Sequence, residues 1–397
     1  MIDDAQLREI RAETPGFAHG AHLLACGSAL QPKPVVDAVI DHLKLEAEIG
    51  GYEAAAANAA AHEDVHDCVA AHIGAAPEEI AIVENATVAW QHAFYALPLR
   101  PGARILTAEA EYAANYVAFL QRAKRDDLTV EVIPSDETGQ LDTKALEAMM
   151  GPDVGLIAIT WVPTNGGLVN PAAEVGRVAR LHGVPYLLDA CQAAGQMRID
   201  VEAIGCDFLS ATARKFLRGP RGIGFLYVSK SQLETIEPAM IDFYGAPWVA
   251  RDEYQLRPDA RRFENWENAY ALRAGLSAAM AYADRIGIDA IEARVAHLGG
   301  FCADLGDALP GVTNMDLGVT RSGIVSFALD GADASGIADE LRQSGFSVGT
   351  SGPGTTRIDA EKRDLPTLLR IAPHYYNTEE EVAGCVKRLG ELMEASA

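Results

Sequence analysis

The sequence predicts an α/β protein, with a mostly parallel sheet in a large domain and a smaller α/β domain toward the C-terminus. Short apolar runs alternate with helical stretches, and they lack the strict polar alternation of strands that are exposed on one face. Strands of this kind are covered by helices on both sides, as in a mostly parallel sheet. The runs are 79–85, 103–109, 129–135, 154–162, 184–190, 206–212 and 222–228.

The smaller α/β region is predicted after an aromatic and turn-rich stretch at residues 243–269. Helical patterns and apolar runs alternate again there, and Thr378 with Glu381 forms a capping-box pattern at the start of the last helix. The predicted helices are 270–287, 291–308, 334–345 and the segment from 377, and the predicted strands are 323–329, 346–350 and 368–374.

These patterns divide the chain into three parts. We expect an N-terminal segment, 1–20, that packs with the small domain, a large domain at 21–258 and a small C-terminal domain at 259–397. An alanine-rich stretch at 50–75 predicts a plain helix within the large domain.

Composition narrows the class of protein. A length of 397 residues is typical of about two domains, and a net charge of −23 argues against a nucleic-acid partner or an anionic membrane surface. The six cysteines are scattered without metal-like spacing, so we expect reduced thiols and no metal site. The acidic N-terminal stretch lacks the apolar segment of a signal peptide, and no run reaches about 18 apolar residues. We expect a cytoplasmic protein that acts on a small molecule.

An aspartate and a lysine fall at the ends of predicted strands, where open α/β sheets bind ligands. Asp189 closes the strand in 184–190, and Lys215 follows the next predicted strand. A carboxylate buried at a strand end needs a cationic or hydrogen-bonding partner, which a protonated ring nitrogen would supply. A lysine at the same edge can form a Schiff base, so the pair favours pyridoxal phosphate.

The phosphate of that cofactor needs hydrogen-bond donors. Asn85, Ala86 and Thr87 open a predicted helix directly after a strand, so they offer backbone amides and a hydroxyl. Thr212 and Arg214, next to the lysine, can add two further donors. A phosphate and a Schiff base therefore explain why positive charge gathers here in an acidic chain.

Six stretches, in this order, resemble the class V aminotransferase superfamily of fold-type I pyridoxal-phosphate enzymes: "ENATVA", "EAEYAAN", "PTNGG", "LDACQA", "ATARKF" and "RFENWENA". The resemblance runs over nearly the whole chain, from "GGYEA" to "LLRIAPHYYNTEEEV", and is specific as a set. The superfamily contains cysteine desulfurases, isopenicillin-N-epimerase-like proteins and the carbon-sulfur lyase of ergothioneine biosynthesis. The stretches "IGGYEA" and "LLRIAPH" resemble the last of these.

The resemblance implies catalytic roles for residues that match the family pattern. Lys215 matches the Schiff-base lysine and Asp189 the partner of the pyridine nitrogen. Tyr112 stands where family members place a ring, often a histidine, that stacks on the cofactor, and Gln192 would bond the phenolic oxygen. The residues that would hold the phosphate are Ala86, Thr87, Thr212 and Arg214.

The resemblance also implies how substrate and subunits meet. Arg370 would bind the substrate carboxylate, and an arginine within the apolar run 368–374 needs an anionic partner in any case. Asn165 would face the substrate and the cofactor, although the local spacing could equally put Thr164 there. Relatives pass a loop matching part of 258–270 into the neighbouring subunit's site, which implies a homodimer with a shared active site.

One departure from the family pattern concerns the sulfur acceptor. In cysteine desulfurases the loop after the strand that matches 346–350 carries the acceptor cysteine, whereas the loop predicted at 351–364 has none. Cys302 and Cys385 fall in amphipathic helices, where buried structural cysteine is usual. We therefore expect β-elimination at a carbon-sulfur bond of an α-amino acid, with transamination or epimerisation as the alternative.

Other readings of the same residues are less well supported. A non-catalytic binding or regulatory protein with this fold would have lost Lys215 or Asp189, and both are present. A nicotinamide-dependent dehydrogenase is disfavoured because "GPRGIG" precedes a strand and does not open a dinucleotide-binding helix. We also expect several charged residues to be solvated rather than functional. They are His62, His66 and His72 on one helix, and Arg218 and Arg221 in a loop, with an interface position as the alternative for the two arginines.

Overall fold

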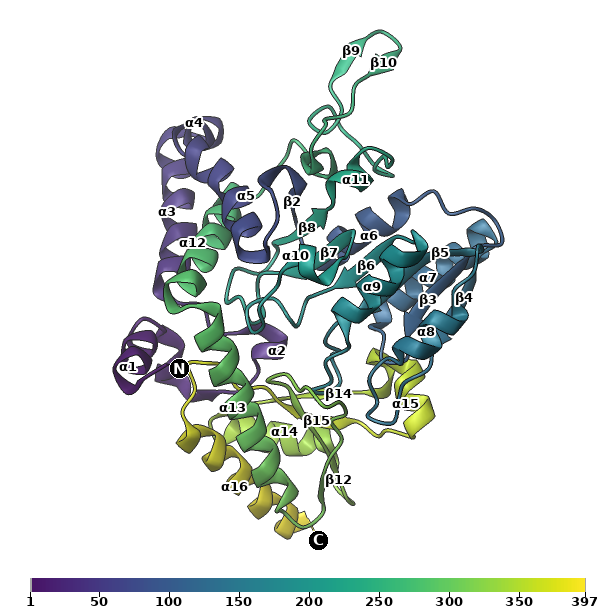
Figure 1. Ribbon diagram of the computed structural model, residues 1–397. Coiled ribbons are helices and arrows are strands. Elements are labelled where there is room, and N and C mark those ends of the chain that lie inside the picture. The colour runs from purple at the N-terminus through teal and green to yellow at the C-terminus, as the bar shows by residue number, and fades with distance from the viewer. Residues whose placement is uncertain (1, 397) are drawn as a thin grey trace.

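The computed structural model describes residues 2–396, so the outermost residues of the predicted N-terminal segment and C-terminal domain, Met1 and Ala397, lie outside the described residues. Seven strands form the central sheet in the order β2-β8-β7-β6-β5-β3-β4 (Figure 1). β8 runs antiparallel to both of its neighbours, and the other neighbouring pairs are parallel. These strands are β2 (Ile80–Val83), β3 (Arg104–Ala108), β4 (Thr129–Ile133), β5 (Val154–Thr160), β6 (Tyr186–Asp189), β7 (Phe208–Thr212) and β8 (Gly224–Val228). The predicted mostly parallel sheet is confirmed.

Successive residues of a central strand enter two different cores. On one face Leu187 packs in a cluster with Trp90 and Phe119, from the helices α6 and α7. On the other face Leu188 packs in a cluster with Val175, from α9. The strands are apolar at every position because both faces are covered, which is the pattern that the sequence shows. The helices named are α6 (Ala86–Ala96), α7 (Ala113–Asp126) and α9 (Ala172–His182).

A second sheet forms the C-terminal body, with four antiparallel strands in the order β11-β12-β15-β14. Thr378 and Glu381 make the reciprocal capping contacts predicted at the start of the last helix. The strands are β11 (Val312–Asn314), β12 (Val325–Leu329), β14 (Gly349–Ser351) and β15 (Leu368–Ile371). The helices are α13 (Ile288–Asp307), α14 (Ala334–Gln343) and α16 (Glu379–Ser396).

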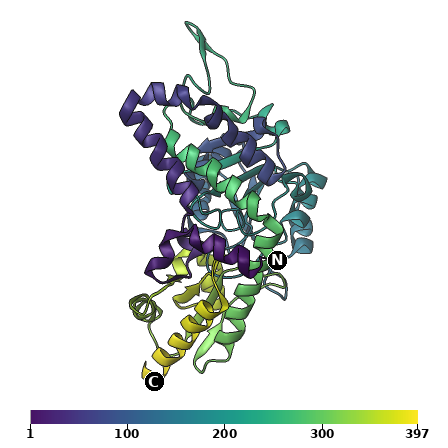
Figure 2. The same cartoon turned by 90° about the vertical axis from the view of Figure 1, so that its left-hand side faces the viewer.

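The N-terminal helix α1 (Asp4–Ala12) lies at the junction of the two bodies in both views (Figures 1 and 2). Arg11 donates hydrogen bonds to the carbonyl oxygen of Tyr376 and to the carboxylate of Glu381, so the segment contacts the C-terminal region. β1 (Ala21–His22) pairs in parallel with β13 (Phe346–Ser347).

Helix α12 (Tyr270–Ile286) packs against α3 (Lys33–Ile49) and α5 (Ala59–Ile73), although the predicted boundary places it in the small domain. The division at residue 258 stays a prediction. No helix within residues 2–396 combines the length and the apolar character that crossing a membrane requires.

Several local expectations differ from the structure. The alanine-rich stretch forms two helices, α4 (Gly51–Ala57) and α5, which meet at Asn58. The predicted loop 351–364 contains a short helix, α15 (Arg357–Arg363). A hairpin of β9 (Trp248–Ala250) and β10 (Glu253–Tyr254) projects from the large body, at the top of Figure 1.

The histidines of α5 were predicted to lie on the surface, but the structure buries their side chains. His62 and His66 are buried, and the side chain of His72 is 3% exposed. His66 Nε2 lies 2.7 Å from Glu264 Oε1, and burial is the main cause that lowers the pKa of His62 to about 4. The prediction failed because α12, far away in the sequence, covers this face of α5.

Arg218 is also buried, contrary to the prediction that it is solvated, whereas Arg221 is exposed as expected. The Arg218 guanidinium donates to Leu30 O at 2.8 Å and to the hydroxyls of Tyr375 and Thr14 at 2.8 and 2.6 Å. These partners come from three distant segments, so the local "RGPRG" pattern could not reveal the burial.

Candidate active site

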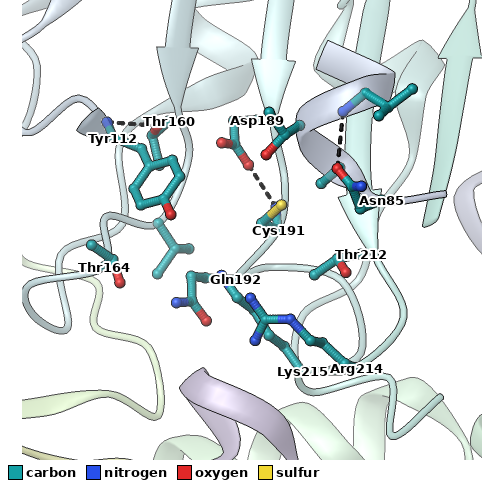
Figure 3. Close-up of a pocket in the computed structure, with 14 residues that line it drawn as sticks. Asn85, Tyr112, Thr160, Thr164, Asp189, Cys191, Gln192, Thr212, Arg214 and Lys215 are labelled. Carbon is teal, nitrogen blue, oxygen red and sulfur yellow. Dashed lines mark hydrogen bonds between the residues drawn. The ribbon is translucent and has the colours of Figure 1, made fainter. Parts of the chain in front are cut away.

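A cavity of about 470 Å³ opens at the carboxyl ends of the central strands (Figure 3). The turn after β2, the start of α7 and the ends of β5, β6 and β7 all contribute residues to it. This is the edge where the sequence places a ligand. The predicted residues that line it are Asn85, Ala86, Thr87, Tyr112, Asp189, Gln192, Thr212, Arg214 and Lys215.

Asp189 ends β6 and is 4% exposed. The backbone N–H of Cys191 donates to its Oδ1 at 2.9 Å, and the amide Nδ2 of Asn115 donates to its Oδ2 at 2.9 Å. These two neutral donors fix the orientation of the carboxylate. A cationic ligand in the cavity would add the charged partner that a buried carboxylate prefers.

Lys215 follows β7 in a tight loop that a hydrogen bond from Gly219 N to Ala213 O closes at 2.8 Å. Burial lowers the pKa of the Lys215 amine below its ordinary value, and the positive charge of Arg214 acts in the same direction. A lower pKa increases the fraction of neutral amine, which is the form that attacks an aldehyde or accepts a proton.

The end of the cavity near α6 is suited to an anion. Asn85 caps this eleven-residue helix by accepting a hydrogen bond from Val88 N at 3.0 Å, and the free amides of the first turn face the same end. Thr87 and Thr212 add hydroxyls there, and Arg214 adds a guanidinium that also donates to the carbonyl of Gly27. These groups could hold a phosphate.

Gln192 leaves a buried polar atom unsatisfied. It is 3% exposed, its Nε2 donates to Cys26 O at 3.2 Å, and its Oε1 has no partner. A buried amide oxygen in this condition costs free energy unless a ligand completes it. The lysine, the buried carboxylate, the anion-binding end and this orphaned amide together fit pyridoxal phosphate.

Tyr112 stands at the start of α7 with its ring in the cavity (Figure 3). It is 38% exposed, and its backbone N–H donates to Glu111 Oε1 at 3.0 Å and to Thr160 Oγ1 at 3.3 Å. The backbone is therefore held firmly, while the ring remains free to contact a ligand.

Thr164, and not Asn165, reaches the cavity. The amide Nδ2 of Asn165 donates to Asp359 Oδ2 on α15 at 2.8 Å, so Thr164 is the one of the two predicted alternatives that lines the cavity. Arg370 lies outside the lining of the cavity, but its Nη1 donates to the carbonyl oxygen and hydroxyl of Thr164. The Nε atom of Arg370 is buried without a partner.

Three side chains of the C-terminal body hold the segment 164–167. In addition to Arg370 and Asp359, the carboxylate of Asp316 accepts a hydrogen bond from Gly167 N at 2.9 Å. Burial is the main cause that raises the pKa of Asp316 to about 6. This segment therefore forms a polar link between the cavity wall and the C-terminal body.

Some residues that shape the site have no role predicted from the sequence. Thr160, Val162 and Cys191 line the cavity, and Asn115 and Glu111 support Asp189 from behind. Glu111 closely follows the apolar run 103–109, and this position after a strand is the signal that the sequence contains. Asn115 lies in the first turn of α7.

The fold and the cavity define a class of protein. A lysine and a buried aspartate share a cavity at the carboxyl edge of a mostly parallel seven-stranded sheet, as in fold-type I pyridoxal-phosphate enzymes. The family model Aminotransferase class-V matches residues 21–384, and the chain belongs to this family of pyridoxal-phosphate enzymes. Both the predicted family and the predicted cofactor are confirmed.

Relatives in this family include cysteine desulfurases. The chain is 30% identical, over 98% of its length and 95% of the relative's, to the "Probable cysteine desulfurase" of Halobacterium salinarum. It is also 30% identical to the cysteine desulfurase of Dickeya dadantii, over 94% and 92% of the two chains. An apo cysteine desulfurase from Thermococcus onnurineus NA1 superposes with a TM-score of 0.91 at 26% identity, and covers 98% of each chain.

Proposed function

We propose that this protein is a pyridoxal-phosphate-dependent lyase that eliminates a sulfur leaving group from the β-carbon of an α-amino acid. The observation that carries the proposal is the convergence of Lys215 and Asp189 on one cavity, with Arg370 anchored to its wall through Thr164. The desulfurase relatives support carbon-sulfur chemistry. The alternative on the same residues is an aminotransferase or an epimerase.

Each residue has a defined task in this proposal. When bound, pyridoxal phosphate holds the substrate amine covalently and accepts the electron pair released at the α-carbon. Lys215, freed as a neutral amine, removes the α-proton, and Asp189 keeps a proton on the ring nitrogen. The bond from the β-carbon to sulfur would then break with its electron pair leaving on sulfur, while the electron pair from the α-carbon forms the double bond between the α- and β-carbons. Arg370 holds the substrate carboxylate.

The fate of the sulfur follows from the thiols near the cavity. Residues 351–364, which match the desulfurase loop, contain no cysteine. Cys191 lines the cavity, but burial raises the pKa of its thiol far above the ordinary value. Because the nucleophile in sulfur transfer is the thiolate, Cys191 is a poor acceptor. We infer that sulfur leaves as a small molecule rather than as a persulfide on the protein.

Product analysis of wild type and Lys215→Ala tests the function. Wild type should release pyruvate, ammonia and a thiol or sulfide from cysteine or an S-substituted cysteine. Lys215→Ala should lose the visible absorbance of the lysine-bound cofactor and all turnover, while it keeps the circular dichroism of the wild type. Amino-group transfer to a 2-oxo acid without thiol release would favour the aminotransferase, and turnover by Lys215→Ala would contradict the catalytic assignment.

The proposal includes a cytoplasmic homodimer whose active site is shared through part of 258–270. Aromatic side chains around that segment are exposed, among them Phe243, Trp248 and Trp266, which is typical of an interface. Arg262 instead donates to carbonyls of its own chain. Light scattering should give the mass of a dimer, and Trp266→Glu should lower it toward a monomer.

Val319 is 78% exposed in the C-terminal body, so Val319→Glu is the matched control for this test and should leave the dimer intact. A monomeric wild type would contradict the shared site.

A further inference from the structure

Glu111 is a buried carboxylate surrounded by neutral donors. It is 3% exposed and lies between the end of β3 and the start of α7. Its oxygens accept hydrogen bonds from the hydroxyl of Thr107 at 3.0 Å, from Asn115 Nδ2 at 2.9 Å and from Tyr112 N at 3.0 Å. They also accept from the backbone N–H and the hydroxyl of Thr160 at 2.9 and 2.6 Å.

No cationic side chain among residues 2–396 forms an ion pair with Glu111. Its charged neighbour is Asp189, which is also anionic, and burial is the main cause that raises the pKa of Glu111 to about 7. Burial raises the pKa of the Tyr186 phenol, on the same strand as Asp189, and the negative charge of Glu111 acts in the same direction. A buried carboxylate usually has a cationic partner, which can be a protein side chain or a bound ligand.

Asn115 connects the carboxylate of Glu111 to that of Asp189, which lines the cavity. Its Nδ2 atom donates to Glu111 Oε1 and to Asp189 Oδ2, both at 2.9 Å, so these two oxygens are less than about 6 Å apart. Two carboxylates this close repel each other strongly in a water-poor site. A cation placed against Asp189 would relieve that repulsion for both.

We propose that Glu111 is a positioning residue that acts through Asn115 on Asp189, so that two carboxylates instead of one hold the proton on the cofactor's ring nitrogen. The inference rests on the proposed role of Asp189 as partner of that nitrogen. Glu111 also accepts hydrogen bonds from Tyr112 and Thr160, two residues of the cavity wall. One buried carboxylate therefore helps to position Asp189, Tyr112 and Thr160.

A purely structural role would have a different signature. If Glu111 served only to tie β3, β5 and α7 together, its loss would lower stability and leave the ring nitrogen's pKa unchanged. If its charge acts through Asn115, removal of that charge must lower the ring nitrogen's pKa, because less negative potential remains to stabilise the proton. The protonation state of the ring nitrogen separates the two roles.

The experiment uses the holoenzyme without substrate, reconstituted with cofactor labelled with ¹⁵N in the ring, and follows the nitrogen's chemical shift against pH. Glu111→Gln keeps the size of the side chain and should lower the nitrogen's pKa by roughly one unit. Asn115→Ser removes the bridge but keeps the Glu111 charge, and should shift the pKa in the same direction. It carries the test if Glu111→Gln does not fold.

Two further variants calibrate the result. Asp189→Asn should lower the nitrogen's pKa more than Glu111→Gln does. Glu131→Gln, on the edge strand β4 where Glu131 pairs with Arg104, should leave it unchanged. If Asp189→Asn shifts the titration and neither Glu111→Gln nor Asn115→Ser does, the inference is overturned while the proposed function stands. If Asp189→Asn leaves the titration unchanged, the proposed role of Asp189 is wrong, and the inference fails with it.

Discussion

Arg370 on β15 donates two hydrogen bonds to Thr164, to the carbonyl oxygen at 2.6 Å and to the hydroxyl at 2.7 Å. Both come from Nη1, and the buried Nε has no partner. The guanidinium is therefore anchored at one corner, with a donor still unsatisfied beside a residue that lines the cavity. The role that we propose for Arg370 is a planar two-point contact between this guanidinium and the substrate carboxylate.

Arg370→Lys should raise the KM for the amino acid by a factor on the order of 10 to 100, because lysine cannot make a planar two-point contact. The cofactor's absorbance should not change. Steady-state kinetics of both enzymes check this prediction. Arg177→Lys, on an exposed pair with Glu147, is the matched control and should behave as wild type. Loss of cofactor, or an unchanged KM, would make Arg370 structural and leave Arg357 and Arg363 as the next candidates.

Asp189→Asn should retain cofactor but lower kcat by roughly 100-fold or more, because an amide cannot stabilise a protonated ring nitrogen as a carboxylate does. Cofactor occupancy from absorbance and kcat from product release are measured on the same sample. Asp207→Asn changes another largely buried aspartate, which accepts from Tyr186 N before β7, and should leave kcat near the wild-type value. An equal effect of both variants would indicate a general loss of stability instead of a catalytic role.

Asp359→Ala should loosen helix α15 from the cavity wall, because Asp359 accepts from Asn165 Nδ2 at 2.8 Å and from Arg363 Nη1 at 3.3 Å. Loss of such a buried charged contact costs about 1 to 2 kcal/mol, so the amides of α15 should exchange roughly 5 to 30 times faster. Hydrogen exchange with mass spectrometry measures this. Glu361→Ala removes an exposed pair with Arg357 and should have little effect. Equal exchange in wild type and Asp359→Ala would show that this contact does not hold α15.

The pH dependence of apoprotein stability should carry the signature of Glu111. Its pKa is raised from 4.5 to about 7 in the folded protein, mainly by burial. The folded state therefore binds the proton on Glu111 more tightly than the unfolded state does. The stabilisation of the folded state that results is complete below pH 4.5 and is lost as the pH rises to about 7. The loss amounts to about 3 kcal/mol. Urea unfolding from pH 4.5 to 8 should show this loss in wild type relative to Glu111→Gln, and parallel curves would contradict it.

Much of the site could be predicted because its residues follow directly from strands. Asp189 ends β6 and Lys215 follows β7, and parallel strands bring their carboxyl ends to one edge whatever the details of packing. Thr87 lies in the first turn of a helix that Asn85 caps, which the sequence also predicts. Apolar runs of this length also indicate how strands and helices alternate along the chain. The sequence by itself therefore determined the sheet, the cofactor and the edge at which Asp189 and Lys215 line one cavity.

The tertiary structure decided which neighbouring side chain faces the cavity and which charges are buried. Thr164 rather than Asn165 reaches the cavity because Asp359, almost 200 positions later, captures the asparagine amide. Arg218 is buried because hydroxyls and rings from both ends of the chain surround it. Asn115 links Glu111 to Asp189 through two hydrogen bonds. Contacts of this kind depend on which distant groups arrive at hydrogen-bonding distance, and a local pattern of residues does not contain that information.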